Sequence, residues 1–171
     1  MGMSREIVII TEDAYGGEFF KRLLRRLNRE GLAAVRLKKI RGRKNPIHAP
    51  FLCDPKLNRI ITATELAKPD FILVVYDGDG PSNYDSRKKD VEKHIPKNVK
   101  TPVKILLFEY EIEEWICRSL DYNWSTKPSD ELKRREGYDK YKLPNYVDKL
   151  EFEKLKRNCK SFREFLRILG D

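Results

Sequence analysis

The sequence predicts an α/β fold with a mainly parallel central sheet, helices on both faces and a helical C-terminal extension. Short, continuous apolar runs alternate with segments whose apolar residues recur at helical spacing. Runs of this kind are typical of strands buried on both faces, and parallel strands need helical crossovers. We expect a single domain overall, with an α/β core over residues 1–121 and an extension over residues 122–171 that packs on it.

The first half of the chain predicts two strands, two helices and a long loop. Residues 17–30 carry apolar side chains at helical spacing, and Gly31 ends this helix. Gly42 and three prolines make residues 41–56 a loop. The assignment is strand over 6–10, helix over 17–30, strand over 32–40 and loop over 41–56. Residues 57–67 are compatible with a helix or a strand, and the helix is favoured.

The second half predicts two buried strands and further helices. The run FILVVY over residues 71–76 is apolar, rich in β-branched residues and bounded by Pro69 and Gly78. Ser161 and Glu164 suit a capping box at the start of the last helix. The assignment is strand over 71–76, helix over 85–95, strand over 103–110, helix over 113–121 and helix over 161–169, with a loop-rich region before the last helix.

Composition limits the classes of protein. The chain is 40% hydrophobic, which excludes compositional disorder, and no apolar run reaches the roughly 18 residues of a membrane helix. Its three cysteines are far apart in the sequence, which argues against a disulfide framework or a zinc site. Two histidines are too few for a histidine-based metal site. We therefore expect a cytoplasmic protein without a membrane partner.

Positive charge is concentrated in one segment. The net charge is +9, and residues 21–44 hold eleven Lys or Arg but only one acid, Glu30. Such a segment attracts phosphate backbones without reading sequence. A helix and loop with a solvated cationic face is the alternative. A second basic and aromatic loop spans residues 137–144, and it is either a nucleic-acid contact or a surface loop anchored by tyrosines. The expected nucleic-acid contacts are Lys38, Lys39, Arg41, Arg43, Lys44 and Lys140.

Acidic residues follow three of the predicted strands. Glu12 comes just after the first strand, Asp77 and Asp79 follow the strand over 71–76, and Glu113 is one of several acids after the strand over 103–110. The carboxyl ends of parallel strands meet at one edge of the sheet, so these side chains should converge. Clustered carboxylates repel one another, and a divalent cation such as Mg²⁺ offsets the repulsion. The sequence therefore predicts a metal site.

The motif DGDG has other interpretations besides a magnesium site. An EF-hand loop would place Pro81 at its fifth position and Lys88 at its twelfth, where glutamate is needed, so that interpretation fails. Haloacid-dehalogenase phosphatases also carry Asp-x-Asp-Gly after a strand, but after their first strand and normally followed by threonine, whereas Pro81 follows here. An acidic surface turn without a function is the remaining alternative.

The order of these residues resembles the Toprim fold, which type IA and type II topoisomerases, DnaG-type primases and nucleases of the overcoming-lysogenization-defect (OLD) type share. Glu12 in IVIITED matches the signature glutamate, and Asp77 and Asp79 in VVYDGDG match the paired aspartates. Glu18 resembles a second glutamate of OLD-type and small stand-alone Toprim-like proteins. Glu113, two residues before a tryptophan, resembles their Glu-x-Trp element, and SFREFLRIL their C-terminal helix.

The resemblance implies metal-dependent phosphodiester chemistry. Asp77 and Asp79 would bind Mg²⁺ or Mn²⁺, and Glu12 would be a ligand or a general acid or base. Glu18 and Glu113 would complete a second metal site, which makes Glu12, Asp77, Asp79 and Glu113 the expected catalytic residues. One cation among Arg118, Lys140 and Lys142 would neutralise the reacting phosphate.

The resemblance also has departures. Glycine usually follows the signature glutamate, whereas Asp13 follows it here, and the sequence holds no P-loop motif. The expected function is a Mg²⁺- or Mn²⁺-dependent nuclease that acts on DNA or RNA. The alternative is a non-catalytic module that binds nucleic acid or a nucleotide and works with a partner protein.

Overall fold

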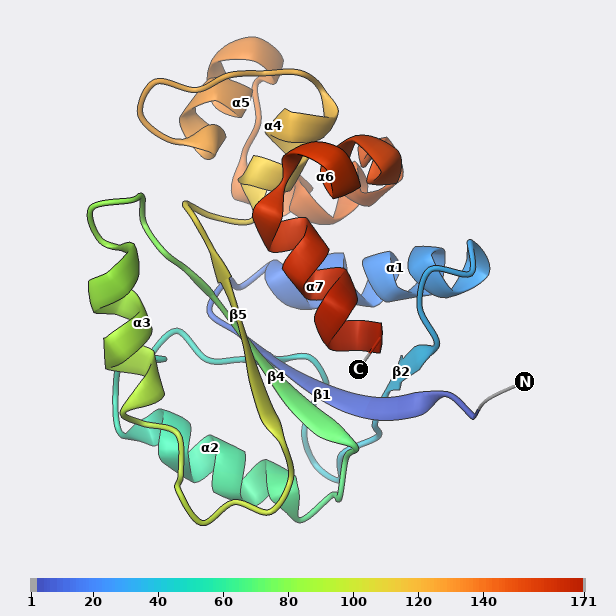
Figure 1. Ribbon diagram of the computed structural model, residues 1–171, viewed down its shortest axis with the longest axis vertical. Helices are drawn as coiled ribbons and strands as arrows, with labels where there is room; N and C mark the ends of the chain where they lie inside the picture. Colours follow the sequence, from blue (N-terminus) through green and yellow to red (C-terminus); the bar gives the residue numbers. More distant parts are fainter. Residues whose placement is uncertain (1–2, 171) are drawn as a thin grey trace.

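A parallel sheet lies between two layers of helices in the computed structural model, which describes residues 3–170 (Figure 1). The elements in chain order are β1 (Arg5–Thr11), α1 (Gly16–Arg29), β2 (Val35–Leu37), β3 (Ile47–His48), α2 (Lys56–Glu65), β4 (Phe71–Asp77), α3 (Tyr84–Glu92), β5 (Val103–Phe108), α4 (Glu113–Ser119), α5 (Pro128–Glu136), the 3-10 helix η1 (Lys140–Lys149), α6 (Phe152–Asn158) and α7 (Lys160–Gly170).

The strands of the sheet follow the order β2-β1-β4-β5, and the short strand β3 also pairs with β1. All pairs are parallel; in the register, Ile10 of β1 lies opposite Val74 of β4, and Val74 lies opposite Ile105 of β5. The fold class expected from the sequence, an α/β protein with a parallel sheet and a helical C-terminal region, is confirmed.

The edge beside β1 differs from the expected strand over 32–40. Only Val35–Leu37 form a strand, and a second short strand, β3, lies in the expected loop. Between them the side chain of Asn45 takes the place of a strand partner. Its Nδ2 donates to the backbone oxygen of Ile7 at 2.9 Å, and its Oδ1 accepts from the amide of Ile9 at 3.1 Å. The amide therefore satisfies backbone groups that a break in the edge strand would leave unpaired.

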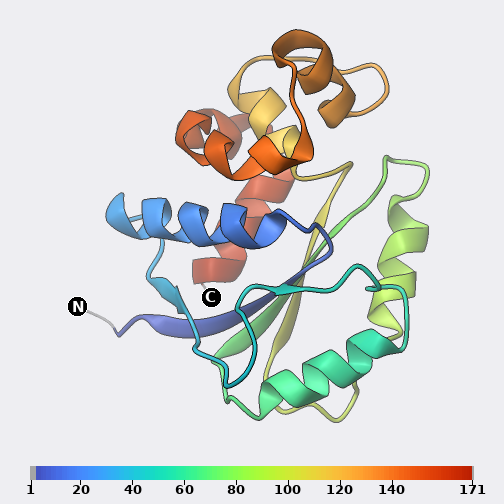
Figure 2. The same ribbon diagram turned by 180° about the vertical axis from the view of Figure 1, so that it is seen from behind.

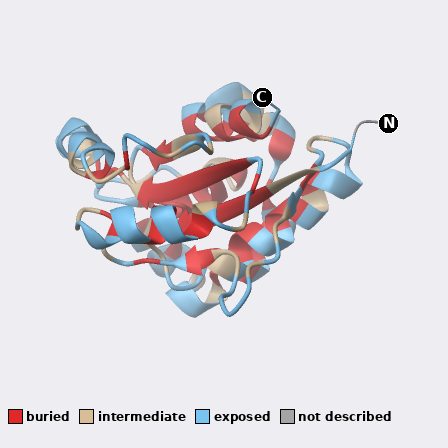
Figure 3. Cartoon of the chain, turned by 90° about the horizontal axis from the view of Figure 1, so that it is seen from below, coloured by how far each residue is buried: buried red, intermediate tan, exposed pale blue. Residues whose placement is uncertain are grey.

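Side chains of the central strands alternate between two cores. Ile7 and Ile9 face the core that α1, α4, η1, α6 and α7 cover, whereas Val8 and Ile10 face the core under α2 and α3. Figure 2 shows α1 and α2 on opposite sides of the sheet, and Figure 3 shows that the strands are buried while the outer sides of the helices are exposed. Burial on both faces accounts for the continuous apolar runs of the sequence.

Trp115 of α4 lies at the centre of the larger core and is fully buried. Its ring contacts Phe108 of β5, with centroids 4.9 Å apart, and both Phe162 and Phe165 of α7, each at 5.2 Å. Aromatic pairs at these separations contribute beyond the area that they bury. The C-terminal helix is therefore part of the same core as the sheet.

The start of α7 differs from the expected capping box. Ser161 lies inside the first turn, and its hydroxyl donates to Oε2 of Glu114 at 2.7 Å and accepts from Nε1 of Trp115 at 2.8 Å. Glu164 pairs with Arg167 instead of reaching back to the helix start. The capping-box prediction is wrong because the Ser161 hydroxyl hydrogen-bonds to a buried carboxylate and an indole of α4, not to the start of its own helix.

Among residues 3–170, none of the helices is both long and apolar enough to cross a membrane.

Candidate carboxylate site at the sheet edge

Glu12 lies at the point where β1 and β4 end side by side. Its amide donates to the backbone oxygen of Val75 at 3.3 Å, which continues the parallel ladder by one residue. Its Oε1 accepts a hydrogen bond of 3.1 Å from the amide of Asp77. The Glu12 carboxylate therefore contacts the backbone of Asp77 at the shared end of β1 and β4.

The turn after β4 folds over the end of β5. The amide of Gly78 donates to the oxygen of Phe108 at 3.0 Å, and the amide of Asp79 donates to that of Tyr110 at 3.1 Å. A Cβ atom at Gly78 would lie 2.3 Å from the Phe108 oxygen, so only glycine fits there. Asp79 has a positive φ of 57°, a conformation that aspartate tolerates better than most residues. This turn leaves the Asp79 side chain 55% exposed, whereas burial raises the pKa of Asp77.

Arg87 of α3 reaches into this turn, although no sequence pattern singled it out. Its Nη2 lies 2.6 Å from Oε2 of Glu12, and its Nε lies 3.4 Å from Oδ2 of Asp79. The same Nε donates to the backbone oxygen of Asp77 at 3.0 Å. One guanidinium therefore fixes both acidic strand ends and the backbone between them, as the rigid planar fork of arginine allows.

A second cation, Lys140 of η1, joins the other acids. Its Nζ lies 2.7 Å from Oε1 of Glu113 and 2.8 Å from Oδ2 of Asp13. Burial opposes the charged lysine, but the charges of Glu113 and Asp13 outweigh it and hold the pKa of Lys140 above its ordinary range. Asp13, which stands where the resembled fold usually has glycine, thus anchors this lysine. Oε1 of Glu113 also accepts from the hydroxyl of Tyr138 at 2.8 Å.

The carboxylates act on one another through their charges. The pKa of Asp77 is well above its ordinary value, first because the group is buried and then because Glu12 and Glu113 carry like charges nearby. The pKa of Glu111 is raised to about 7 by burial and by the charge of Glu113. Oε2 of Glu111 and Oε2 of Glu113 are both buried without a hydrogen-bond partner. Such groups are costly unless a ligand or a proton satisfies them.

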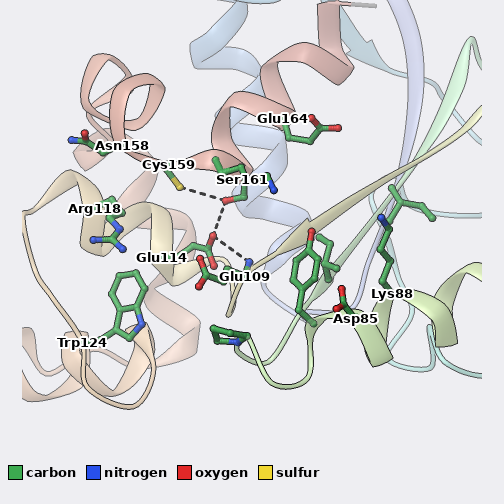
Figure 4. A pocket seen from close by; sticks show the side chains of 15 residues that line it. Asp85, Lys88, Glu109, Glu114, Arg118, Trp124, Asn158, Cys159, Ser161 and Glu164 are labelled. Carbon is green, nitrogen blue, oxygen red and sulfur yellow. Dashed lines mark hydrogen bonds between the residues drawn. The ribbon is translucent and has the colours of Figure 1, made fainter.

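Glu111 was missed by the sequence analysis, which selected only Glu113 from the run of acids after β5. The side chain of Glu111 is held through Oε1, which accepts a 2.6 Å hydrogen bond from Ser129 of α5. The neighbouring Glu114 has a different role: it accepts from the amide of Tyr110 at 2.8 Å and from Ser161, the hydrogen bond drawn in Figure 4. Glu114 therefore supports the loop between β5 and α4, whereas Glu111 lines the cleft that contains Asp77, Asp79 and Lys140.

Glu18 is not brought to this cluster. It lies in the first turn of α1, exposed, and pairs with Arg22 one turn further along the same helix at 3.1 Å. Its charge is not among those that raise the pKa of Asp77. Glu18 instead lines a separate cleft between α1 and the segment that contains β3.

Two clefts open beside the carboxylates. An acidic one of about 440 Å³ is lined by Asp77, Asp79, Glu111 and Lys140, together with residues of α5 and the loop before it. A basic one of about 780 Å³ lies next to the end of β1, where His48 is opposite Thr11. The basic side chains that line it are Lys21, Arg43, Lys44 and His48.

The expected nucleic-acid contacts fall in four places. Arg43 and Lys44 line the basic cleft, and Lys140 lies in the carboxylate site. Lys39 and Arg41 are exposed at the turn that leads to the cleft. Lys38 is further from it, since its Nζ pairs at 3.3 Å with Glu6 near the start of β1. Of the other candidate cations, Lys142 contacts the backbone oxygen of Gly137 and Arg118 lies over the ring of Trp124.

The acids of the site match the expected Mg²⁺ or Mn²⁺ in chemistry but not in arrangement. Across residues 3–170, no group of three or more His, Cys, Asp or Glu side chains is arranged so that it could hold a metal ion. Protein cations instead contact the acids, Arg87 on Glu12 and Lys140 on Glu113. The chemical type of the ligands nevertheless suits these ions, because all are carboxylate oxygens, which Mg²⁺ and Mn²⁺ prefer. Two of these oxygens are buried without a hydrogen-bond partner.

Comparisons with known proteins return nothing: no family model, curated protein or solved structure matches the chain. The parallel sheet order β2-β1-β4-β5 is compatible with Toprim-like and with Rossmann-like folds. Function is therefore inferred from the site alone.

Proposed function

We propose that this protein is a metal-dependent phosphodiesterase of Toprim type, a nuclease that acts on DNA or RNA. The observation that carries the proposal is geometric: Oε1 of Glu12 accepts from the amide of Asp77 where β1 and β4 end, and buried oxygens of Glu111 and Glu113 lack hydrogen-bond partners. Burial and the charges of Glu12 and Glu113 also raise the pKa of Asp77. Three parallel strands place these like charges at one edge of the sheet, where they cost stability. Evolution retains such an arrangement at functional sites, where a bound cation or substrate offsets the cost.

The metal ligands in this proposal are Asp77, Asp79 and Glu12, with the unpartnered oxygens of Glu111 and Glu113 beside them. When bound, a divalent ion supplies Lewis-acid stabilisation of the negative charge on the reacting phosphate. Arg87 holds Glu12 and the turn after β4 in place through the contacts described above. Glu18 has no part in this set, because it faces the basic cleft.

In the proposal, one side chain transfers a proton and another neutralises the negative charge of the phosphate. Glu111 holds a proton up to about pH 7, the range in which a general acid or base works at neutral pH. Lys140 lines the same cleft and stays charged, so it neutralises a phosphate oxygen that enters there. The proposal takes Lys140 from the three cations considered in the sequence analysis, since it alone of them contacts the acids of the site.

The basic cleft supplies the affinity for nucleic acid. Within the described residues Lys21, Arg43 and Lys44 have no acidic partner, so their charges are available to phosphates. The cleft borders the end of β1, directly before Glu12. A phosphate backbone in the cleft would therefore lead to the carboxylates, and its binding would weaken as salt concentration rises.

The test is cleavage of labelled single-stranded DNA, duplex DNA, supercoiled DNA and RNA with Mg²⁺ or Mn²⁺. Asp77→Asn is compared with the wild type and with Asp148→Asn, which makes the same change of charge at an exposed position that has no hydrogen bond or ion pair within the described residues. We expect metal-dependent cleavage by the wild type and by Asp148→Asn and at least a hundredfold loss in Asp77→Asn. Cleavage at equal rates by all three proteins would refute the proposal.

A second candidate is a non-catalytic module that binds nucleic acid or a nucleotide. It is favoured by the ion pairs of Arg87 and Lys140, which neutralise the acids without a metal. Binding that is equal in the wild type and in Asp77→Asn, with no cleavage under any metal, would support this candidate over the nuclease.

A further inference from the structure

A small pocket of about 230 Å³ adjoins the carboxylate site. It is lined by Glu109, Tyr110, Arg118, Asn123 and Trp124. Tyr110 also lines the cleft that contains Asp77 and Lys140, so the pocket and the proposed phosphate site share a wall. On its other side Trp124 and Arg118 border a larger groove along the outer edge of β5 (Figure 4).

The pocket has the chemistry of a stacking surface. The Cζ atom of Arg118 lies over the indole of Trp124, 4.5 Å from the ring centroid, and Tyr110 meets the same indole edge-on at 5.4 Å. Within residues 3–170, Arg118 has no acidic partner at ion-pair distance, so its N–H groups are left for a ligand. Arginine planes and aromatic rings are the surfaces on which proteins stack unpaired bases.

Two polar side chains complete the pocket. Asn123 offers an amide and Glu109 a carboxylate, and both are exposed at its rim. An amide presents donors and an acceptor, and a carboxylate accepts from exocyclic amino groups, so together they suit the edge of a nucleobase. A base in a duplex is stacked and paired and cannot enter such a pocket without leaving the helix.

We propose that this pocket binds one unpaired nucleobase next to the scissile phosphate, so that the protein acts on single-stranded nucleic acid. The inference rests on the proposed function, because the shared wall of Tyr110 makes the pocket a neighbour of the reacting phosphate. Trp124 and Arg118 form the stacking surface, and Asn123 and Glu109 contact the edge of the base. Loss of one stacked base of this kind typically weakens binding about tenfold or more.

The test uses the fluorescence of Trp124 in EDTA, where binding is measured without cleavage. The chain has two tryptophans, and Trp115 is fully buried, so quenching by a ligand reports Trp124. The wild-type protein is titrated with short single-stranded DNA, single-stranded RNA and a blunt duplex, and binding is followed in parallel by anisotropy of a label on the nucleic acid. The DNA and RNA arms show which sugar the site prefers.

We expect the single strands to quench Trp124, and the duplex to bind without quenching it. Arg118→Ala should weaken single-strand binding about tenfold, whereas Arg59→Ala, an exposed arginine on α2, should leave it unchanged. Trp124→Phe should keep most of the affinity and lose the signal. Single strands that bind by anisotropy without quenching Trp124 would overturn the subsite and leave the proposed function intact. If no nucleic acid binds, both the base-binding pocket and the proposed nuclease function are overturned.

Discussion

Nη2 of Arg87 lies 2.6 Å from Oε2 of Glu12, so a helix on one face of the sheet fixes the acid at the tip of β1. The same guanidinium donates to the backbone oxygen of Asp77. Ten residues separate Arg87 from Asp77 in the chain, and 75 separate it from Glu12. Arg87 is therefore the link that makes two acidic strand ends one site.

Arg87→Lys is the first prediction. Lysine keeps the charge but cannot contact Glu12 and the Asp77 backbone with one planar fork. Because residues that orient metal ligands typically contribute 10- to 100-fold, we expect the nuclease activity proposed above to fall by about that factor. The measurement is kcat and KM on a labelled single strand, with Arg59→Lys as the matched control. Activity equal to that of the control would show that Arg87 has no positioning role.

Asp77→Asn should change stability in opposite directions with and without metal. In EDTA, replacing a buried carboxyl among like charges by a neutral amide should raise the free energy of unfolding by about 1 kcal/mol. Saturating Mn²⁺ should stabilise the wild type by about 2 to 3 kcal/mol at a hundred times its Kd, and should not stabilise the variant. Urea unfolding measures both effects. If Mn²⁺ does not stabilise the wild-type protein, the carboxylate site does not bind this metal and the prediction is wrong.

Glu111 gives the metal-free protein a distinct pH dependence. The pKa of this glutamate is about 7 in the folded protein and near 4.5 when unfolded. Between these values the folded state holds the proton that the unfolded state has released, so the free energy of unfolding falls as pH rises from about 4.5 to 7. The fall amounts to about 3 kcal/mol at most.

Glu111→Gln should remove this part of the pH dependence, because glutamine does not titrate. Unfolding by urea in EDTA at pH 5, 6 and 7.5 is the measurement, and Glu153→Gln on the exposed side of α6 is the control. The same slope in Glu111→Gln and in the wild type would mean that another group carries the proton.

Gly78→Ala should damage the site through the backbone. Its Cβ would lie 2.3 Å from the Phe108 oxygen, and backbone must move to admit it. We expect a loss of about 2 to 3 kcal/mol of stability together with a loss of activity, because the turn also carries Asp79. Gly170→Ala meets no atom within 4 Å and should be close to neutral. A wild-type melting temperature for Gly78→Ala would contradict the described turn.

Much of the fold followed from local patterns. The apolar runs of β1 and β4 are continuous because both faces of these strands are buried, and that pattern is readable from sequence. β5 is fully buried only over Leu106–Phe108. β3 was not predictable, since it is two residues long and follows a proline, and the substitution of the Asn45 amide for a strand partner depends on tertiary contacts.

The site was predictable where strand ends determine it. Glu12 and Asp77 meet because β1 and β4 are neighbours in the sheet, which the alternation of strands and helices implied. Arg87 and Glu111 were not predictable, because their contacts depend on how α3 and α5 are placed against the sheet. Glu18 shows the converse: its position in the first helical turn is compatible with a ligand, but its side chain faces another cleft.

The central claim is that these carboxylates bind a divalent metal, and Mn²⁺ binding tests it most directly. Electron paramagnetic resonance of free Mn²⁺, titrated with the wild type, Asp77→Asn and Asp148→Asn, counts bound ions without a substrate. We expect the wild type and Asp148→Asn to bind at least one ion at the same affinity, and Asp77→Asn to bind at least a hundredfold more weakly. No binding by the wild type, or equal binding by all three proteins, would contradict the claim.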